Sequence, residues 1–489
     1  MSDTVSAESS TATINTSSRK SPSQLTPSQK RLVLVGISLA SFMTPFGMSM
    51  LNLSLPEIGA EFGVSAYALG WVSTACLFSS VIFLVPMARI SDLVGRKKIF
   101  LLGMLIATVG AVLEPFSPSF WILILLRISD GLAMACVFST SLPILSSIYP
   151  PSQRGSVFGI NVAVVYLGSS MGPVIGGIMT ANFGWRSIFI LLVPLAILGT
   201  LMVYKYLKME VIEGKGEIFD YKGALLYMIT LFFLLLGLSN LPATWAFGSL
   251  ALGLLILPVF IYYVKNQEFP VMRIRLFLTN KHFARSNFAA FLNYAGTYSV
   301  AFFLSLYLQR VLYLPADTAG LILLAQPVLQ AVFSPFIGRL SDKMDSRYLS
   351  TFGMLLLAAG LFLLSTMTAE TPLIYLIFYE VLLGIGFAFF ASPNTSTIMN
   401  CVGRKDYSSA SASLSVMRQS GMVLSMAIAM CAISVFLGST EMLNSDTVLN
   451  FMAAIRTTFY IGTCLCLAGA VLSYLRGPTT RKDEDCEIL

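Results

Sequence analysis

Arg127, Asp130 and Glu380 are ionisable side chains inside long apolar segments of the sequence, where charge is costly and usually retained for function. Arg127 and Asp130 are three residues apart, so on a helix they share one face and can form an ion pair. Burial favours a neutral carboxyl group and a nearby cation favours an ionised one, so Asp130 could bind and release a proton. Glu380 is alone in its segment and should often be neutral. Asp130, Arg127 and Glu380 are therefore candidate proton-coupling residues; a purely structural ion pair is the alternative for the first two.

Uncharged polar residues in the apolar segments form a second group, with possible contact to a substrate. Each of them could equally make a hydrogen bond between helices. They are Asn52, Asn293, Tyr294, Gln326, Gln330 and Asn394. A further acid, Glu114, precedes Pro115 near the outer end of an apolar segment, and we expect it at the membrane interface.

Other chemistries lack the residues that they need. The seven cysteines contain no CxxC pair and the single histidine is His282, so the sequence predicts no metal site and no disulfide framework. We find no nucleophile–base constellation and no glycine-rich phosphate loop followed by Lys and Ser or Thr. We therefore expect no enzymatic activity, no cofactor and no ATP-driven pump.

The residues above are carried by apolar segments that run from about residue 32 to 475, roughly fourteen of them, each of membrane-spanning length. Of 489 residues, 56% are hydrophobic and 11% are charged, whereas a soluble domain carries about 25% charge. In lipid only helices and closed barrels satisfy the backbone, and long apolar runs without alternation favour helices. The sequence therefore predicts an all-α polytopic membrane protein in a lipid bilayer.

Lysine and arginine are enriched in alternate connections, which predicts the orientation in the membrane. The connection after the second segment contains Arg96-Lys97-Lys98, whereas the connection after the first contains Glu57 and Glu61. Both termini are thus expected in the cytosol and the protein in the cell membrane, and residues 1–30 lack the apolar core of a cleavable signal peptide. This bias accounts for the net charge of +7, and no basic block of the kind that binds nucleic acid is present.

Two stretches of the first half of the chain recur in the second half. Arg127 and Gly131 correspond to Glu380 and Gly384, and the run from Ala88 to Asp92 corresponds to the run from Gly338 to Asp342. The offset accommodates six helices and an inserted pair, which predicts two six-helix halves related as repeats. The predicted parts are a disordered cytosolic tail (1–30), an N-terminal six-helix half (31–210), an inserted two-helix linker (211–270), a C-terminal six-helix half (271–476) and a cytosolic tail (477–489).

The most specific motif is Ala88-Arg-Ile-Ser-Asp-Leu-Val-Gly-Arg-Lys-Lys98, between the second and third segments. It resembles the cytosolic loop signature of the major facilitator superfamily, with Ala88 in place of the leading glycine. Asp92 can meet the positive end of a neighbouring helix, Gly95 permits a tight turn, and Arg96 can pair with a carboxylate. With Asp342 in the repeat, these residues are predicted to latch the two halves in the outward-facing state; a generic basic loop is the alternative.

A second motif places glycines at every fourth position of the fifth segment. It contains Gly168, Gly172, Pro173, Gly176 and Gly177. The glycines form a smooth face for close helix approach, and the proline bends the helix. The stretch resembles the antiporter signature of exporters, which implies export. With Trp185-Arg186 and Asp220-Tyr-Lys-Gly223, the motifs resemble the fourteen-helix drug:proton antiporter branch of the superfamily.

One position departs from the pattern of that branch. Its first helix usually carries an aspartate upstream of Asn-Val-Ala-Leu-Pro. Here Asn52-Leu-Ser-Leu-Pro56 matches, but the aspartate position is Gly47. The usual carboxylate for protons or cations is therefore absent, which shifts the expected coupling role to Asp130 and Glu380 and weakens the case for cationic substrates.

The resemblance implies a secondary active transporter, with proton-coupled, multidrug-type efflux of small amphipathic compounds by alternating access about a midplane site. Two alternatives share the fold: a dedicated exporter of one endogenous metabolite or lipid, and a transport-dead membrane sensor or scaffold. The expected partners are the lipid bilayer, a small-molecule substrate and protons. The sequence does not determine the oligomeric state, and a monomer is compatible with it.

Overall fold

The computed structural model describes residues 25–210, 212, 214, 216–341, 343–402, 407–438 and 447–477. Most of the two predicted tails and the predicted latch residue Asp342 lie outside these ranges.

Within the described residues, fourteen helices are long and apolar enough to cross a membrane, which confirms the predicted all-α polytopic class. The first six spans are α1 (Pro27–Phe62), α2 (Ala66–Val94), α3 (Arg96–Leu113) with the short 3₁₀ turn η2 (Glu114–Phe116), α4 (Phe120–Ile148), α5 (Pro151–Phe183) and α6 (Arg186–Tyr206). The next two are α7 (Tyr221–Ser239) and α8 (Thr244–Lys265).

The remaining spans follow the short helix α9 (Arg275–Thr279). Two of them are interrupted, so that α10 (Lys281–Thr297), α11 (Ser299–Leu306) and the π turn η3 (Tyr307–Val311) make one span, and α12 (Ala316–Leu323) with α13 (Ala325–Ser341) makes another. The last four are α14 (Ser346–Ser365), α15 (Leu373–Asn400), α16 (Tyr407–Phe436) and α17 (Val448–Leu475).

The first helix begins at Pro27, before the predicted start of the N-terminal half at residue 31. Thr26 caps it: the Thr26 Oγ1 accepts a hydrogen bond from the Gln29 backbone N–H at 3.3 Å, and the Gln29 Oε1 accepts one from the Thr26 N–H at 3.0 Å. Pro27 fits the first helical position because it has no N–H to satisfy. The run Thr26-Pro-Ser-Gln29 has the capping-box pattern of a helix start. Its polar composition alone favours the tail, in which the sequence prediction places it.

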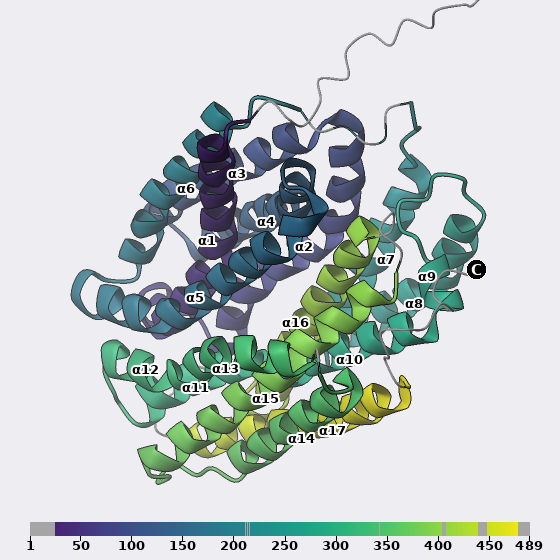
Figure 1. The fold of residues 1–489 in the computed structure, drawn as a ribbon. Coiled ribbons are helices and arrows are strands. Elements are labelled where there is room, and N and C mark those ends of the chain that lie inside the picture. The colour runs from purple at the N-terminus through teal and green to yellow at the C-terminus, as the bar shows by residue number, and fades with distance from the viewer. Residues whose placement is uncertain are drawn as a thin grey trace, which may run out of the picture.

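The helices form two bundles with an additional pair at one side (Figure 1). In the first bundle α1 packs on α5 and α6, and α4 packs on α2 and α3. In the second, α14 packs on α15 and α17, and α10 packs on α16 and α17. The two six-helix halves expected from the repeat are therefore present as two bodies.

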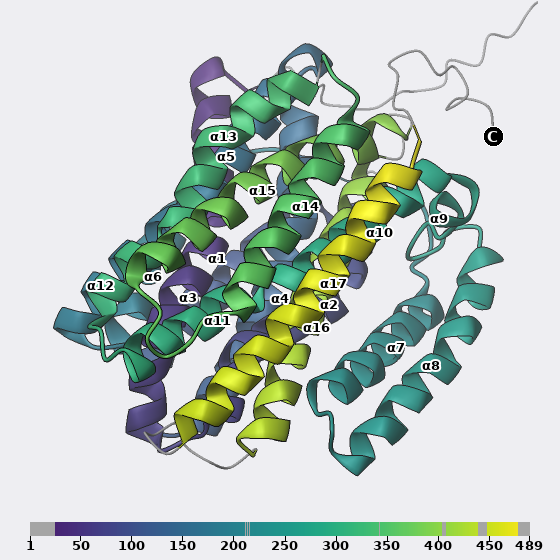
Figure 2. The same cartoon turned by 90° about the horizontal axis from the view of Figure 1, so that it is seen from below.

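The inserted pair contacts both bundles through α7. Helix α7 packs on α2 of the first bundle and on α16 of the second, and α8 packs on α7 (Figure 2). The contact with α2 includes two hydrogen bonds: the Tyr227 hydroxyl donates to the Val81 carbonyl at 2.9 Å, and the Tyr67 hydroxyl donates to Asn240 Oδ1 at 3.2 Å. The contact with α16 includes an apolar cluster to which Val416 belongs.

The two bundles meet near the end of the molecule where α1 ends and α2 begins. The Ser305 hydroxyl donates to the Asn52 carbonyl at 2.5 Å, and the Gln309 side-chain amide donates to the Leu53 carbonyl at 3.1 Å. Arg310 donates to the Pro56 carbonyl at the same end. Helix α12 packs closely on α5 here, because Gly320 faces Pro173 without a side chain.

Candidate functional site

An arginine inside the first bundle binds two carboxylates at once. Arg127 and Asp130 lie one turn apart on α4, and Arg127 Nη1 donates to Asp130 Oδ2 at 2.7 Å. The same nitrogen donates to Glu114 Oε1 at 2.9 Å. Glu114 is 1% exposed, so its side chain faces the interior of the bundle. The turn η2 after α3 directs its side chain into the bundle, where Arg127 compensates its charge.

This acid–arginine cluster, Glu114, Arg127 and Asp130, borders a cavity of about 80 Å³. Water needs about 10–15 Å³ of such volume and several polar partners, so the cavity has room for water beside the carboxylates. Gly47 of α1 lines the same cavity. The position where the antiporter branch usually carries its first-helix aspartate thus faces the two acids that α4 and η2 supply.

Other titratable groups face the cluster from neighbouring helices. Cys76 of α2 lies beside Arg127 and both acids. Tyr298, from the second bundle, lies beside Cys76 and Arg127. Arg127 Nη2 also lies 3.6 Å from the Met48 sulfur of α1. The second bundle therefore approaches the cluster at Tyr298, which lies between α10 and α11.

Glu380 has different surroundings. It is 1% exposed on α15, and neither carboxylate oxygen has a hydrogen-bond partner. An isolated buried carboxylate is so costly that the group must be held in its neutral form. The structure therefore keeps Glu380 and Asp130, which the sequence grouped together, in separate bundles, with Asp130 paired to Arg127 and Glu380 without a partner.

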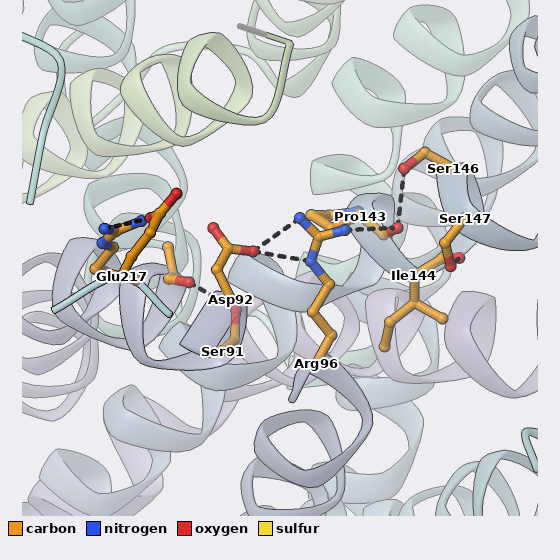
Figure 3. A network of polar contacts seen from close by, with 10 residues as sticks. Ser91, Asp92, Arg96, Pro143, Ile144, Ser146, Ser147 and Glu217 are labelled. Atoms are coloured by element: carbon orange, nitrogen blue, oxygen red, sulfur yellow. Dashed lines mark hydrogen bonds and ion pairs between the residues drawn. The ribbon is translucent and has the colours of Figure 1, made fainter. Parts of the chain in front are cut away.

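The loop motif places a second ion pair where α2 ends and α3 begins. Arg96 Nε and Nη2 both donate to Asp92 Oδ1, at 2.9 and 2.8 Å, and Arg96 Nη1 lies 3.4 Å from the Pro143 carbonyl of α4 (Figure 3). Gly95 has φ +127°, a conformation that other residues rarely adopt. Asp92, Gly95 and Arg96 thus form a compact unit within the first bundle, and Asp342 lies outside the described residues.

The connection between α6 and α7 packs on this motif, which the sequence did not indicate. The N-terminus of α3 has no side-chain cap of its own, and Glu210 Oε1 accepts a hydrogen bond from the Lys97 N–H at 2.9 Å. Glu217 pairs with Arg89 at 2.6 Å (Figure 3). An acid at a helix N-terminus is favoured by the dipole, so the connection stabilises the loop in this conformation.

The glycine motif of α5 faces two helices. Gly168, Gly172 and Gly176 lie against α1, where an added Cβ would meet backbone or Cβ atoms of α1. Gly177 instead lies against Ala316 of α12, in the second bundle, and the Pro173 carbonyl lies against Gly320. The face of α5 that carries Gly168, Gly172 and Gly176 therefore packs within the first bundle. The adjacent face, which carries Gly177, forms the junction with the second bundle.

The polar residues predicted to contact a substrate divide into two groups. Asn293 and Asn394 are buried within the second bundle, where Asn293 Nδ2 contacts the Met354 sulfur at 3.2 Å and Asn394 Nδ2 donates to the Ser286 carbonyl at 3.1 Å. Asn394 Oδ1 also accepts from Arg476 Nη1 at 3.0 Å. The half-buried members are Asn52, Gln326 and Gln330, and the buried Tyr294 lies beneath another arginine.

That arginine is Arg418 of α16, which the sequence reasoning missed. Its guanidinium lies over the ring of Tyr294, with Cζ 5.0 Å from the centroid. Tyr166 of α5, in the first bundle, lies beside Arg418, Tyr294 and Gln330. Arg418 is inside an apolar segment, so the criterion that selected Arg127 would have selected it too.

The arrangement of two helical bundles around a shared central region is that of a membrane transporter, and sequence comparison gives the family. The profile of the Major Facilitator Superfamily matches residues 37–270 and 287–485, so the chain belongs to this superfamily.

Relatives and solved structures agree with this assignment. The chain is 28% identical over 448 residues to the riboflavin transporter RibZ of Clostridioides difficile (strain 630), covering 91% of this chain and 97% of the relative. It is 25% identical to Multidrug resistance protein 3 of Bacillus subtilis (strain 168), over 81% of this chain and 78% of the relative. An inward-facing bacterial homologue of the lysosomal transporter Spinster shares the fold with TM-score 0.67 and 16% identity, over 92% of this chain and 97% of the other.

Proposed function

We propose that this protein is a proton-coupled exporter of small amphipathic compounds that works by alternating access. The observation that carries the proposal is the acid–arginine cluster beside Gly47. Two acids share one arginine, so the cluster has one net negative charge when all three groups are ionised. One bound proton makes it neutral, which is the less costly state inside a membrane protein.

Access to the cluster supports proton exchange. The Asp130 side chain is 16% exposed, whereas that of Glu114 is 1% exposed. Asp130 is thus the member that solvent reaches, and Glu114 holds Arg127 in place. Cys76 of α2 and Tyr298, between α10 and α11, also lie near the cluster, so motion of the second bundle would change its environment. Such a change between two states is what coupling to transport requires.

The contacts between bundles support an inward-facing state. The bundles meet at the end that carries the α1–α2 loop, which lacks lysine and arginine, and the basic α2–α3 loop lies at the other end. Under the positive-inside rule the junction is then extracellular. In this state Asp92 and Arg96 pair within the first bundle. We propose that they engage the second bundle when the cytosolic side closes, and so latch the outward-facing state.

Two candidate substrate ranges remain. The glycine motif of α5 and the relationship to Multidrug resistance protein 3 support export of varied amphipathic compounds. The relationship to RibZ extends over nearly the whole relative and supports a second candidate, transport of one endogenous metabolite. Both candidates share the mechanism proposed above.

Purified protein in proteoliposomes tests the proposal. A panel of amphipathic dyes is loaded, a pH gradient is imposed, and dye efflux and internal pH are followed together. We expect efflux of at least one dye to accelerate with the gradient and to be accompanied by proton movement in the opposite direction. Efflux that is the same with and without the gradient, and without proton movement, would contradict proton coupling.

A further inference from the structure

A group of cationic and aromatic side chains lies where the two bundles face each other, apart from the acid–arginine cluster. It consists of Arg418 of α16, Tyr294 of α10, Tyr166 of α5 and Gln330 of α13. Three of these helices belong to the second bundle and α5 belongs to the first. We call this group the Arg418 site.

The aromatic part of the site is fixed by packing. The Tyr294 ring is 9% exposed and lies against Phe387 of α15, with 5.8 Å between centroids and an angle of 57° between planes. Its other contact is the guanidinium of Arg418 at 5.0 Å, a cation–π arrangement. Because Tyr294 is held from behind, Arg418 has a defined position rather than a free one.

The polar groups of the site are partly exposed even though they lie well inside spanning helices. Arg418, Tyr166 and Gln330 are each only half-buried. A partly exposed polar side chain at such a depth is better accommodated by water or a polar solute than by lipid.

The charge of the site is not compensated by the protein. Among the described residues, no carboxylate lies within 4.0 Å of the Arg418 guanidinium, although the structure holds such pairs elsewhere. Glu114 and Asp130 bind Arg127, and Glu380 is buried without a partner. An intramembrane arginine without an acid is costly, and a bound anion would remove that cost.

We infer that the Arg418 site is the substrate site and that it takes a planar aromatic anion. A guanidinium binds a carboxylate or similar anionic group through two parallel hydrogen bonds. The rings of Tyr166 and Tyr294 suit a flat aromatic body, and the Gln330 amide suits a polar substituent on it. The inference rests on the proposed transport function and specifies its substrate class.

Two dyes with the same xanthene ring system test the inference: fluorescein, an anion at pH 7.4, and rhodamine 123, a cation. Their affinities for protein in nanodiscs are measured by fluorescence anisotropy, with empty nanodiscs as the blank. We expect wild-type protein to bind fluorescein at least about tenfold more tightly than rhodamine 123, the size of effect that one charged hydrogen-bonded contact gives. Equal affinities, including no binding of either dye, would overturn the inference.

Variants then assign the effect to the arginine. Arg418→Gln should weaken fluorescein binding about tenfold or more and leave rhodamine 123 unchanged or bound more tightly. Arg418→Lys keeps the positive charge but lacks the planar guanidinium that makes two parallel hydrogen bonds. The affinity of this variant for fluorescein should therefore be intermediate. Arg456→Gln is the control, because Arg456 is an exposed arginine on α17 outside the site. Unchanged fluorescein binding in folded Arg418→Gln protein would overturn the assignment.

The binding measurement separates this inference from the proposed function. It uses no pH gradient, so it reports the site even in a protein that does not couple to protons. Fluorescein binding that depends on Arg418, together with efflux that ignores the pH gradient, would refute proton coupling and leave the anion site standing. Proton-driven efflux of rhodamine 123 without fluorescein binding would refute the anion site and leave proton coupling standing.

Discussion

Glu114 and Asp130 accept hydrogen bonds from the same nitrogen of Arg127, at 2.9 and 2.7 Å, although they come from different elements of the first bundle. Each acid therefore competes with the other for one positive charge. Loss of a proton from the cluster leaves an excess negative charge that the described surroundings do not neutralise, and this supports the proposal that the cluster binds a proton.

The first prediction concerns this unit. The double variant Glu114→Gln and Asp130→Asn is expected to retain substrate binding and to lose proton movement coupled to substrate, because neutral amides keep the shape but cannot exchange a proton. Asp130→Asn alone should remove most of the coupling, since Asp130 is the more exposed acid. Substrate-driven pH change in proteoliposomes measures the effect.

A control keeps the result specific. Glu61→Gln removes an acid of the same bundle that pairs with Arg186 at the protein surface, so coupling should be normal. If the double variant moved protons with substrate at the wild-type ratio, the proposed role of the cluster would be wrong.

The second prediction is that Glu380 contributes less than Asp130 to proton coupling. Glu380 is buried without a partner, and no cation pairs with it among the described residues, so it should remain protonated through the cycle. Glu380→Gln should therefore change the free energy of unfolding by less than about 1 kcal/mol relative to wild type. It should also keep most of the flux of protons coupled to substrate. A complete loss of proton movement in folded Glu380→Gln protein would place the carrier in the second bundle instead.

The third prediction concerns the loop motif. Asp92→Asn should reduce transport strongly and leave dye binding intact. Asp92 lies near the end of α2 and Arg96 begins α3, and neither helix contributes a residue to the Arg418 site. Arg96→Ala should act in the same direction, with some loss of stability because Arg96 is 1% exposed. Lys98→Gln is the control, since Lys98 is an exposed residue of the same motif. Normal transport rates for Asp92→Asn would refute the latch.

The fourth prediction uses the junction of the bundles. A side chain at Gly320 would collide with the Pro173 carbonyl, so Gly320→Val should prevent closure of the α5–α12 junction. Overpacking costs about 1–3 kcal/mol, which shifts the ratio of open to closed junction by about fivefold to more than a hundredfold. Labelling of a cysteine introduced at Ala316, of α12, should become faster.

Gly248 of α8 provides the matched control for this change. An added Cβ there meets no atom within 4 Å, so Gly248→Val should leave labelling and transport unchanged. Unchanged labelling in Gly320→Val protein would show that α12 does not separate from α5 in the cycle.

The fifth prediction is that both termini lie in the cytosol. It follows from the alternation of lysine and arginine between connections and from an even number of spans. Epitope tags at each end should resist protease added to intact cells and become accessible after permeabilisation. An N-terminal tag that is cleaved on intact cells would invert the orientation.

The fold could be predicted because its signals are local and repeated. Long apolar runs fix the number of spans, and the correspondence of Arg127 with Glu380 pointed to two related halves. The junctions within spans, such as that between α12 and α13, have no comparably strong signal and were missed.

The site could be predicted only where one helix carries all its members. Arg127 and Asp130 are such a pair, whereas Glu114 reaches Arg127 from another element through the turn η2. Glu210 and Glu217 contact the loop motif from a connection whose path no residue pattern indicates. Arg418 could have been found by its charge alone, but its aromatic partners come from other helices.

The unequal contacts of α7 determine how the protein can move. Hydrogen bonds from Tyr227 and to Asn240 fix α7 on α2, and the connection before it binds the α2–α3 loop through Glu210 and Glu217. Apolar side chains of α7 cluster with Val416 of α16, and such an apolar surface can slide without breaking hydrogen bonds. In a rocking cycle the inserted pair would travel with the first bundle, so that eight helices rotate as one body against the other six.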